Sequence, residues 1–523
     1  MAINFVVSKV IIVLWLTIMM VIGAQSLEPW SPLQAPKELV NKFSRDPLLI
    51  SLASTDYGHI IHENPFAIFA PSSINDISNL IKFSNSLPFP FTVAARGQAH
   101  SLQGQSMTNN GIVVNMTELN RLKNGVGIVV SEEKSSLGYY VDVGGEQIWI
   151  DVLHATLERG LTPLSWTDYL FLSVGGTLSN AGISGQSFRF GPQISNVHEL
   201  DVVTGKGDLV TCSKEKNSEL FYAVLGGLGQ FGIITRARIT LGPAPTRVKY
   251  LRLIYDNFSA FSRDQEHLIS LIGLNESNNA PDYLEGLLLL NQQPLDISFY
   301  PEFDQPRVTS LVTQFGILYV IELVKYYDNN TQEHIDEDVK LLVKDLKFVP
   351  TFMFQKDLTY EEFLNRVHSD ELNLRSEGLW DVPHPWLNLF VPRSRISDFD
   401  EGVFKGIILK QNITAGVVLV YPINRSKWND KMSAVTPNED VFYVVSLLHT
   451  AATLDQLESF KAQNQQILQF CEDASIGIKQ YLPQNKTREQ WVQHFGPKWK
   501  SFQQRKVQFD PNRLLSPGQG IFN

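Results

Sequence analysis

A glycine-containing turn at the end of an apolar strand constrains this chain more than any other feature. The residues from Thr92 to Ser101 read Thr-Val-Ala-Ala-Arg-Gly-Gln-Ala-His-Ser, and the apolar stretch Phe89 to Ala95 predicts the strand. Gly97 lets the backbone turn and approach a ligand closely. Arg96 and the neighbouring amides suit an anionic group such as a pyrophosphate, and His100 is a nucleophile that a redox cofactor can capture covalently. Taken alone, a histidine after a tight turn is more often a hydrogen-bonded structural residue.

A second run, Trp166 to Gly185, contains four glycines among small and hydroxyl-bearing residues. Because glycine weakens strands and helices, this density indicates backbone that passes close to a ligand. The hydroxyls of Ser173, Thr177 and Ser179 supply donors for phosphate oxygens. The run is neither a P-loop, since no Gly-Lys-Ser/Thr follows, nor a GxGxxG motif that opens a helix after a strand. A glycine-rich turn between strands is the alternative interpretation.

The N-terminus indicates a targeting signal. Lys9 precedes the short apolar run Val10 to Ile22, and Ala24-Gln25-Ser26 offers a small-residue cleavage site. The run suits a signal peptide over residues 1–24 better than a membrane span, which needs about 20 apolar residues; an uncleaved anchor is the alternative. We therefore expect the chain to enter the secretory pathway and the mature chain to be free of the membrane. Its destination is then the cell exterior (the apoplast in a plant), the endoplasmic reticulum or the vacuole.

Composition and short motifs agree with a secreted protein. Seven Asn-x-Ser/Thr sequons are candidate glycosylation sites, at Asn115, Asn257, Asn275, Asn329, Asn412, Asn424 and Asn485. Two cysteines, Cys212 and Cys471, cannot form a disulfide framework in 523 residues, so one bridge and two free buried thiols are both open. The net charge of −10 argues against binding to nucleic acid or to an anionic membrane surface.

The length predicts two domains, and the pattern of elements changes near residues 242–245, Gly-Pro-Ala-Pro. Before this point short strands alternate with helices, among them a helix capped by Ser73 and a hairpin around Gly205-Lys206-Gly207. After it, longer strands accompany long polar helices at Gln332 to Leu346 and Thr453 to Cys471. That texture is typical of an α+β domain built on an antiparallel sheet.

The two runs together resemble the flavin-binding half of vanillyl-alcohol-oxidase type flavoproteins, and more narrowly the plant cytokinin dehydrogenases. The segments Trp-Thr-Asp-Tyr-Leu from Trp166, His-Pro-Trp-Leu-Asn from His384 and Leu-Ser-Pro-Gly-Gln from Leu515 are all similar to that family. The resemblance implies a two-domain α+β fold of the PCMH type. Its FAD-binding domain is split over residues 27–243 and 480–523, and residues 244–479 form a substrate domain, an antiparallel sheet covered by helices.

The resemblance also implies that FAD is attached covalently through His100. Further cofactor contacts carried over from the family are Ala95, Gly97, Gln98, Ala99, Ser101, Gln105, Asp168, Ser173, Ser179, Ile183, Ile233, Tyr481, Ser516 and Gln519. The family usually has glycine directly before the linking histidine, whereas this chain has Ala99. The added methyl group crowds the turn if this position requires a positive φ.

Two carboxylates are candidates for the chemistry. Asp168 lies in an apolar stretch, where it is either a turn cap or a base whose pKa is moved by burial. Glu285 reads as an exposed strand start. The resemblance makes Asp168 the catalytic base and Glu285 a second active-site carboxylate, and two such groups in one pocket titrate as a coupled pair. It also implies substrate contacts by Trp386, Asn388, Leu482 and Tyr421. No metal site is expected, because the histidines lack matched ligand spacing.

The implied function is oxidation of an N6-isoprenoid adenine, such as isopentenyladenine, to an imine that water splits into adenine and an unsaturated aldehyde. A quinone-like acceptor or oxygen then takes the electrons, and the enzyme is expected to be a monomer. One alternative is a berberine-bridge-like carbohydrate or alcohol oxidase, whose flavin is held by a histidine and a cysteine. No cysteine lies between His100 and Gly185. The other is a non-catalytic secreted cytokinin-binding protein.

Overall fold

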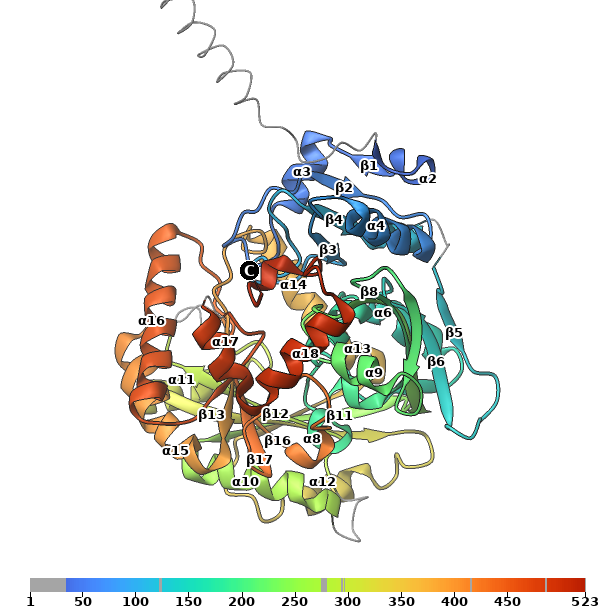
Figure 1. Ribbon diagram of the computed structural model, residues 1–523. Coiled ribbons are helices and arrows are strands. Elements are labelled where there is room, and N and C mark those ends of the chain that lie inside the picture. The colour runs from blue at the N-terminus through green and yellow to red at the C-terminus, as the bar shows by residue number, and fades with distance from the viewer. Residues whose placement is uncertain are drawn as a thin grey trace, which may run out of the picture.

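Three β-sheets form the frame of the protein in a computed structural model (Figure 1). The structure describes residues 34–121, 125–273, 280–292, 295, 297–413, 416–484 and 487–522. The expected signal peptide over residues 1–24 lies outside these ranges, as do Asn275 and Asn485. In the described ranges, no helix is both long and apolar enough to cross a membrane.

The first sheet carries the strand that leads to His100. Its order is β1 (Phe43–Ser44), β2 (Ala67–Phe69), β4 (Ile112–Asn115) and β3 (Val93–Arg96), with β2, β4 and β3 parallel. The C-terminal segment returns to this sheet, because Leu515 pairs with Val93 in a parallel bridge. The buried carboxylate of Asp510 fixes the segment by accepting hydrogen bonds from the amides of Leu514 and Leu515, both at 2.9 Å. Residues far apart in sequence thus meet beside β3 (Figure 1).

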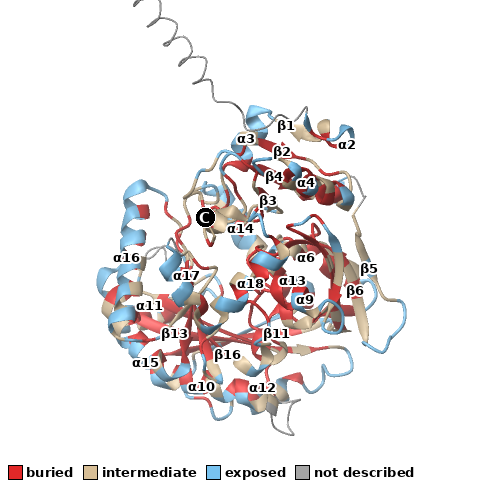
Figure 2. Ribbon diagram, in the orientation of Figure 1, coloured by how far each residue is buried: buried red, intermediate tan, exposed pale blue. Residues whose placement is uncertain are grey.

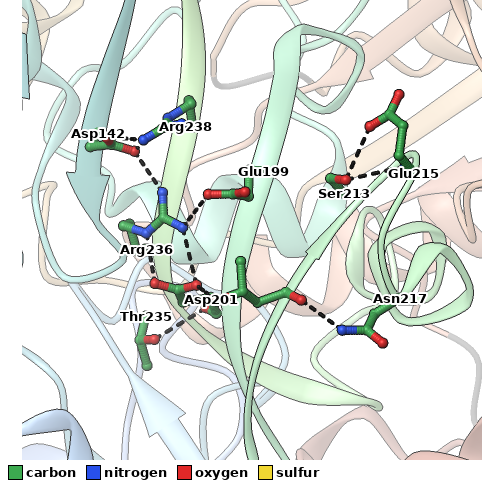
Figure 3. Close-up of polar contacts among 10 residues, drawn as sticks. Asp142, Glu199, Asp201, Ser213, Glu215, Asn217, Thr235, Arg236 and Arg238 are labelled. Atoms are coloured by element: carbon green, nitrogen blue, oxygen red, sulfur yellow. Dashed lines mark hydrogen bonds and ion pairs between the residues drawn. The ribbon is translucent and has the colours of Figure 1, made fainter. Parts of the chain in front are cut away.

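The second sheet is antiparallel and holds a charged network on one face (Figure 3). Its order is β5 (Ile128–Val130), β6 (Tyr139–Gly144), β10 (Gly232–Pro243), β8 (Val197–Thr204) and β9 (Leu209–Ser213), and β7 (Leu161–Pro163) also pairs with β10. Arg236 of β10 bonds Asp142, Glu199 and Asp201 of the flanking strands, each at 2.6 Å, and Arg238 adds a second bond to Asp142. The network ties three adjacent strands together.

The third sheet is the largest and is antiparallel throughout. Its order is β14 (Met353–Thr359), β11 (Arg247–Tyr255), β13 (Ile317–Tyr327), β12 (Tyr283–Leu290), β16 (Val418–Asn424), β17 (Val441–Leu447), β15 (Leu387–Pro392) and β18 (Lys479–Tyr481). The Gly-Pro-Ala-Pro segment spans the end of β10 and the start of the link to β11, and the expected division at residue 480 falls inside β18.

Helices cover the three sheets. In the N-terminal half they are α2 (Lys37–Val40), α3 (Pro47–Ala53), α4 (Ile74–Ser86), α5 (Thr117–Arg121), α6 (Trp149–Leu157), α7 (Val174–Asn180), α8 (Ser187–Phe190) and α9 (Ser218–Val224). The remaining helices are α10 (Phe258–Ser270), α11 (Gln305–Phe315), α12 (Ile335–Val343), α13 (Tyr360–Leu364), α14 (Arg366–Ser376), α15 (Ile396–Phe399), the π-helix η6 (Asp400–Leu409), α16 (Leu454–Asp473), α17 (Arg488–Phe495) and α18 (Trp499–Phe509).

The core continues across the boundary between the second and third sheets. One apolar cluster includes Val141 and Trp149 on the side of the second sheet and Val320 and Tyr421 of the third. A separate cluster fills the other face of the third sheet beneath α10, α15 and η6. Figure 2 shows buried residues along the strands and exposed residues on the outer helices. Because the second and third sheets share apolar contacts, groups from both sides are held at fixed positions.

Several local predictions are confirmed. Ser73 caps α4 by accepting a hydrogen bond from the amide of Asp76, and β8 and β9 form the predicted hairpin. The helix predicted from Thr453 to Cys471 is α16, which begins one residue later and ends at Asp473. The predicted strand from Phe89 to Ala95 is wrong at its start, because β3 begins only at Val93 and Phe89 is 75% exposed in the preceding turn. Cys212 and Cys471 are two free buried thiols, which decides between the two alternatives.

Candidate active site

A cavity of about 1460 Å³ opens among the three sheets and is lined by every site residue that the family resemblance implies. These residues are Ala95, Gly97, Gln98, Ala99, His100, Ser101, Gln105, Asp168, Ser173, Ser179, Ile183, Ile233, Glu285, Trp386, Asn388, Tyr421, Tyr481, Leu482, Ser516 and Gln519. The volume exceeds the range of about 300–1,000 Å³ that is usual for one small ligand. It therefore suits a large cofactor together with a substrate.

His100 lies between two tyrosine rings at one end of this cavity. Its ring stacks on Tyr57 with centroids 4.0 Å apart and on Tyr169 with centroids 5.0 Å apart. Burial, with a smaller contribution from nearby His384, lowers the pKa of His100 to about 3. The imidazole is therefore neutral at neutral pH, with a lone pair available on one ring nitrogen.

The turn before His100 is strained and held by a buried carboxylate. Ala99 adopts φ 56°, so this position does require a positive φ although it carries a methyl group. The carboxylate of Asp56 accepts hydrogen bonds from the Ser101 hydroxyl at 2.7 Å and the Gly104 amide at 2.8 Å. Such strain persists only where surrounding contacts fix the backbone, and it is found at binding sites more often than elsewhere.

The expectation for Arg96 is wrong. Its guanidinium donates to the backbone carbonyls of Thr55 at 2.7 Å and Leu52 at 2.8 Å, at the end of α3, and it does not line the cavity. Arg96 therefore anchors the strand end to α3, and it is not directed at a pyrophosphate. The prediction that the Thr177 and Ser179 hydroxyls donate to phosphate oxygens is also wrong, because they donate to the backbone carbonyls of Val174 at 3.2 Å and Gly175 at 2.7 Å. Backbone amides and the Ser173 hydroxyl of the glycine-rich run are left to face an anionic ligand.

The cofactor side of the cavity fits a flavin dinucleotide. Ser173, Gly175, Gly176 and Ser179 line it from the glycine-rich run, and a Cβ at Gly97 would clash with the Ser173 hydroxyl, so glycine keeps this approach open. Gln519 of the C-terminal segment has a buried Oε1 without a hydrogen-bond partner. Small residues, the Ser173 hydroxyl and the unpartnered Gln519 amide oxygen suit a dinucleotide.

Asp168 lines the cavity and is bonded by residues from the second half of the chain. Its Oδ1 accepts hydrogen bonds from the Tyr283 hydroxyl at 3.1 Å and from Arg366 Nη2 at 3.0 Å. Tyr283 begins β12, and Arg366 begins α14. The base predicted from the first half of the chain is thus held by two donors from the second half.

Glu285 points into the same region but is not fully paired. It is 1% exposed, its Oε1 has no hydrogen-bond partner, and the nearest cation is Arg366 Nη2 at 3.9 Å from Oε2. Burial raises the pKa of Glu285 well above its ordinary value, and the charge of Asp168 adds to this effect. The strand register places Glu285 opposite Glu322. Unlike Glu285, Glu322 is paired directly with an arginine, because Arg252 bonds it at 2.8 Å. The expectation of an exposed strand start is therefore wrong.

The predicted substrate contacts Trp386, Asn388, Tyr421 and Leu482 form one wall of the cavity, called here the substrate side, and this wall presents two unpartnered donors. Trp386 Nε1 and Asn388 Nδ2 are buried without a hydrogen-bond partner, and both residues line the cavity. Tyr421 and Leu482 complete this wall, with Leu482 at φ 53°. Buried polar groups are almost always paired in a native protein, so these donors indicate a polar ligand that fits against them.

Sequence reasoning did not identify several residues around the site. Tyr57 and Arg366 lie in segments that carry no motif, and Tyr283 lies two positions before Glu285 without a motif of its own. Tyr169 was inside the glycine-rich run, and its aromatic ring beside the predicted base was the available signal. Its hydroxyl donates to Glu371 of α14 at 2.6 Å.

Comparisons with known proteins agree with this geometry. Residues 245–522 match the family model described as "Cytokinin dehydrogenase 1, FAD and cytokinin binding", and residues 65–213 match "FAD binding domain". The chain is similar in fold to a chitooligosaccharide oxidase (TM-score 0.67, 13% identity, 91% of this chain and 96% of that one). It is also similar to a VAO-type flavoprotein from Myceliophthora thermophila (TM-score 0.63, 14% identity, 88% and 80%). At these identities the structures show the two-domain fold alone.

The curated relatives are much more similar in sequence. Cytokinin dehydrogenase 4 of Arabidopsis thaliana is 53% identical over 488 residues, covering 91% of this chain and 92% of that protein. Cytokinin dehydrogenase 3 of Arabidopsis thaliana is 52% identical over 500 residues, covering 95% and 93%. Cytokinin dehydrogenase 10 of Oryza sativa subsp. japonica is 50% identical over 498 residues, covering 93% and 89%. These matches favour the main interpretation over both alternatives, and the chain belongs to the cytokinin dehydrogenase family.

Proposed function

We propose that Asp168 is the base with which this FAD-dependent enzyme oxidises isopentenyladenine-type cytokinins. The proposal rests on the hydrogen bonding of Asp168, whose two donors both bind Oδ1. Because Asp168 also lines the cavity, Oδ2 is left to accept a proton from a ligand. Asp168 takes the proton of the secondary amine as a C=N bond forms. When bound, FAD accepts the hydride that leaves the adjacent carbon. Water then splits the imine into adenine and an unsaturated aldehyde.

Glu285, Trp386 and Asn388 hold the substrate in this proposal. Burial raises the pKa of Glu285 and so favours its protonated form, which can donate a hydrogen bond to the amine or ring nitrogens. The unpartnered Asn388 amide meets the polar purine edge, and the Trp386 ring covers apolar atoms. Tyr421 and Leu482 form the wall beside the isoprenoid chain.

FAD is attached through His100 in this proposal. The support is a neutral imidazole fixed between two tyrosine rings at the cavity end. Precipitation of the denatured protein then leaves the yellow colour in the pellet, and His100→Ala releases it to the supernatant. Complete loss of flavin from the denatured wild type would refute the linkage without affecting flavin binding itself. The remaining cofactor contacts are those predicted residues that line the cavity around this end.

The electron acceptor, oligomeric state and compartment are further parts of the proposal. A quinone-like compound or, less readily, oxygen reoxidises the flavin, and the enzyme acts as a monomer. The apolar leader supports entry into the secretory pathway. Among the sequons, the exposed side chains of Asn257, Asn329 and Asn412 are the favoured glycosylation sites. Peptide mapping after enzymatic deglycosylation of the secreted protein tests this choice.

Turnover of isopentenyladenine with an artificial quinone acceptor is the direct test of the activity. We expect adenine and an unsaturated aldehyde in equal amounts, and reduction of one two-electron acceptor per adenine. Purified protein that folds, carries flavin and releases no adenine from any N6-isoprenoid adenine would contradict the proposal. Absence of flavin in folded protein would favour a binding protein without catalytic activity.

A further inference from the structure

We propose that Arg366 is a positioning residue that, with Tyr283, determines which oxygen of Asp168 meets the substrate. This inference rests on the proposed role of Asp168 as base and goes beyond it. Both residues donate to Oδ1, Arg366 Nη2 at 3.0 Å and the Tyr283 hydroxyl at 3.1 Å. Among the described residues, no hydrogen bond to Oδ2 is formed, and Asp168 lines the cavity. Oδ2 is therefore the oxygen left to accept the amine proton.

The packing around Arg366 fixes the position of its guanidinium. Nη1 donates to the backbone carbonyl of Phe363 at 3.3 Å, and the guanidinium carbon lies 4.8 Å from the Phe363 ring and 5.1 Å from the Tyr283 ring. Burial alone would lower the pKa of Arg366, but the neighbouring Tyr283 and Asp168 raise it well above its ordinary value. A planar, permanently charged fork held on two rings is a rigid donor, which an ammonium group does not reproduce.

Tyr283 is brought to the same oxygen by the glycine-rich run. A Cβ at Gly185 would lie 2.6 Å from the Tyr283 ring, and the Gly185 carbonyl accepts a hydrogen bond from the amide of Leu284 at 3.0 Å. Glycine at this position thus lets β12 approach the segment that carries Asp168. The base belongs to the first half of the chain, while both residues that orient it belong to the second half.

The same guanidinium limits repulsion between the two carboxylates. Arg366 is the cation that lies within 4 Å of both, at 3.0 Å from Asp168 and 3.9 Å from Glu285 in the described part of the chain. Without it, Asp168 can rotate about its side-chain bonds and loses the opposite charge beside it. Arg366 lines the cavity, but its hydrogen bonds go to Asp168, Tyr283 and the Phe363 carbonyl, so proton removal should suffer more than substrate binding.

A purely structural role for Arg366 makes a different prediction. Arg189 and Asp282 form a second arginine–aspartate pair between the two halves of the chain, also at 3.0 Å, with similar side-chain exposure. Arg189 does not line the cavity. If both ion pairs only hold the first and second halves of the chain together, then Arg189→Ala and Arg366→Ala should have similar effects on the rate of flavin reduction.

The test compares Arg366→Ala, Arg366→Lys and Arg189→Ala by stopped-flow flavin reduction, with flavin content and adenine affinity measured alongside. Loss of a charge-assisted hydrogen bond predicts that Arg366→Ala reduces its flavin about 10- to 100-fold more slowly. Flavin content and adenine affinity stay near wild type, and Arg189→Ala reduces normally. Millimolar guanidinium chloride restores part of the rate to Arg366→Ala, and Arg366→Lys retains part of it.

The results separate this inference from the base assignment. An equal loss in Arg189→Ala, a normal rate in Arg366→Ala, or a loss in adenine affinity that accounts for the slower rate would overturn the positioning role. If Arg366→Ala does not fold, Tyr283→Phe removes the other donor to Oδ1, and an unchanged rate in that variant would also overturn it. A normal rate in Asp168→Asn would instead remove the proposed function.

Discussion

Two arginine–carboxylate clusters in this protein differ in how completely they are paired. Arg236, in the second sheet, bonds three carboxylates at 2.6 Å each, and Arg238 adds to one of them (Figure 3). Arg366, at the cavity, bonds one oxygen of Asp168 at 3.0 Å and lies 3.9 Å from Glu285, whose other oxygen is unpartnered. In the first cluster every carboxylate is bonded directly to an arginine, while the second, within the described residues, leaves oxygens of Asp168 and Glu285 without such a bond.

The pKa values of the carboxyl groups differ between the two clusters in the same way as their pairing does. Burial would raise the pKa of Asp201, but hydrogen bonds from Arg236 and Thr211 lower it, so this carboxylate stays charged. At the cavity, burial raises the pKa of Glu285 and its single distant cation does not compensate. Complete pairing therefore marks a structural tie between strands, and incomplete pairing marks groups that can exchange a proton or bind a polar ligand.

Replacement of Arg236 should break the complete cluster and cost stability without touching the chemistry. Arg236→Met leaves three partly buried carboxylates facing one another. We expect the free energy of unfolding to fall by about 3 kcal/mol, the lower end of the range for removing one partner of a buried pair. The lower end applies because the carboxylates are up to 29% exposed. Chemical denaturation measures this loss. Flavin reduction per bound flavin should stay normal, and Lys340→Met, which breaks the exposed pair with Glu337, should change neither quantity.

Trp386→Ala tests whether an unpartnered group on the substrate side serves a ligand. Its Nε1 is buried without a partner, so the side chain is expected to serve a ligand rather than the fold. Loss of its apolar contact should raise KM for isopentenyladenine by an effect on the order of 1–3 kcal/mol. Steady-state kinetics across several cytokinins measure the change. An unchanged KM with an unchanged substrate ranking would place the ring in the structural core.

Glu285 should reveal its incomplete pairing in the pH dependence of stability. A carboxyl group whose pKa is raised in the folded state holds a proton that the unfolded chain has lost above its ordinary pKa of about 4.3. Stability is therefore lost as pH rises through that window, by up to about 1.4 kcal/mol per pH unit for one proton. Glu285→Gln should remove this slope and be relatively more stable at high pH. Denaturation midpoints between acidic and neutral pH test this, and identical slopes would refute the raised pKa.

Replacement of Ala99 tests the backbone strain of the turn beside the cavity, and not the pairing of charges. Its φ of 56° lies in the left-handed region, so Ala99→Gly should stabilise the turn by about 1 kcal/mol, the cost of this conformation for a residue with a Cβ. The fraction of flavin retained after denaturation should stay the same or rise. A destabilised variant would mean that the methyl group contributes packing that outweighs the strain.

Local patterns predicted much of the fold, and long-range contacts explain what they missed. The cap at Ser73 and the hairpin after β8 depend on neighbouring residues, so they were visible in the sequence. The interpretation of Arg96 is wrong because its acceptors, the carbonyls of Thr55 and Leu52, lie at the end of α3, 41 and 44 positions earlier in the chain.

The site shows the same limit. The resemblance supplied Asp168 and Glu285, but nothing in a polar helix indicated that Arg366 would meet an aspartate 198 positions earlier. Spacing likewise gave no sign that Tyr283 would reach the same oxygen. The register of β12 and the close approach at Gly185 create that contact, and both are properties of the assembled sheets.

The assignment of Asp168 as the base is decided by single-turnover flavin reduction with isopentenyladenine in Asp168→Asn, compared with Glu285→Gln. Asparagine keeps the shape and removes the proton acceptor. A positioned base contributes about 10²–10⁴-fold, so Asp168→Asn should slow reduction by that order, with normal flavin content, and Glu285→Gln should slow it less. A near wild-type rate in Asp168→Asn, or a larger loss in Glu285→Gln, would contradict the assignment of Asp168 as the base.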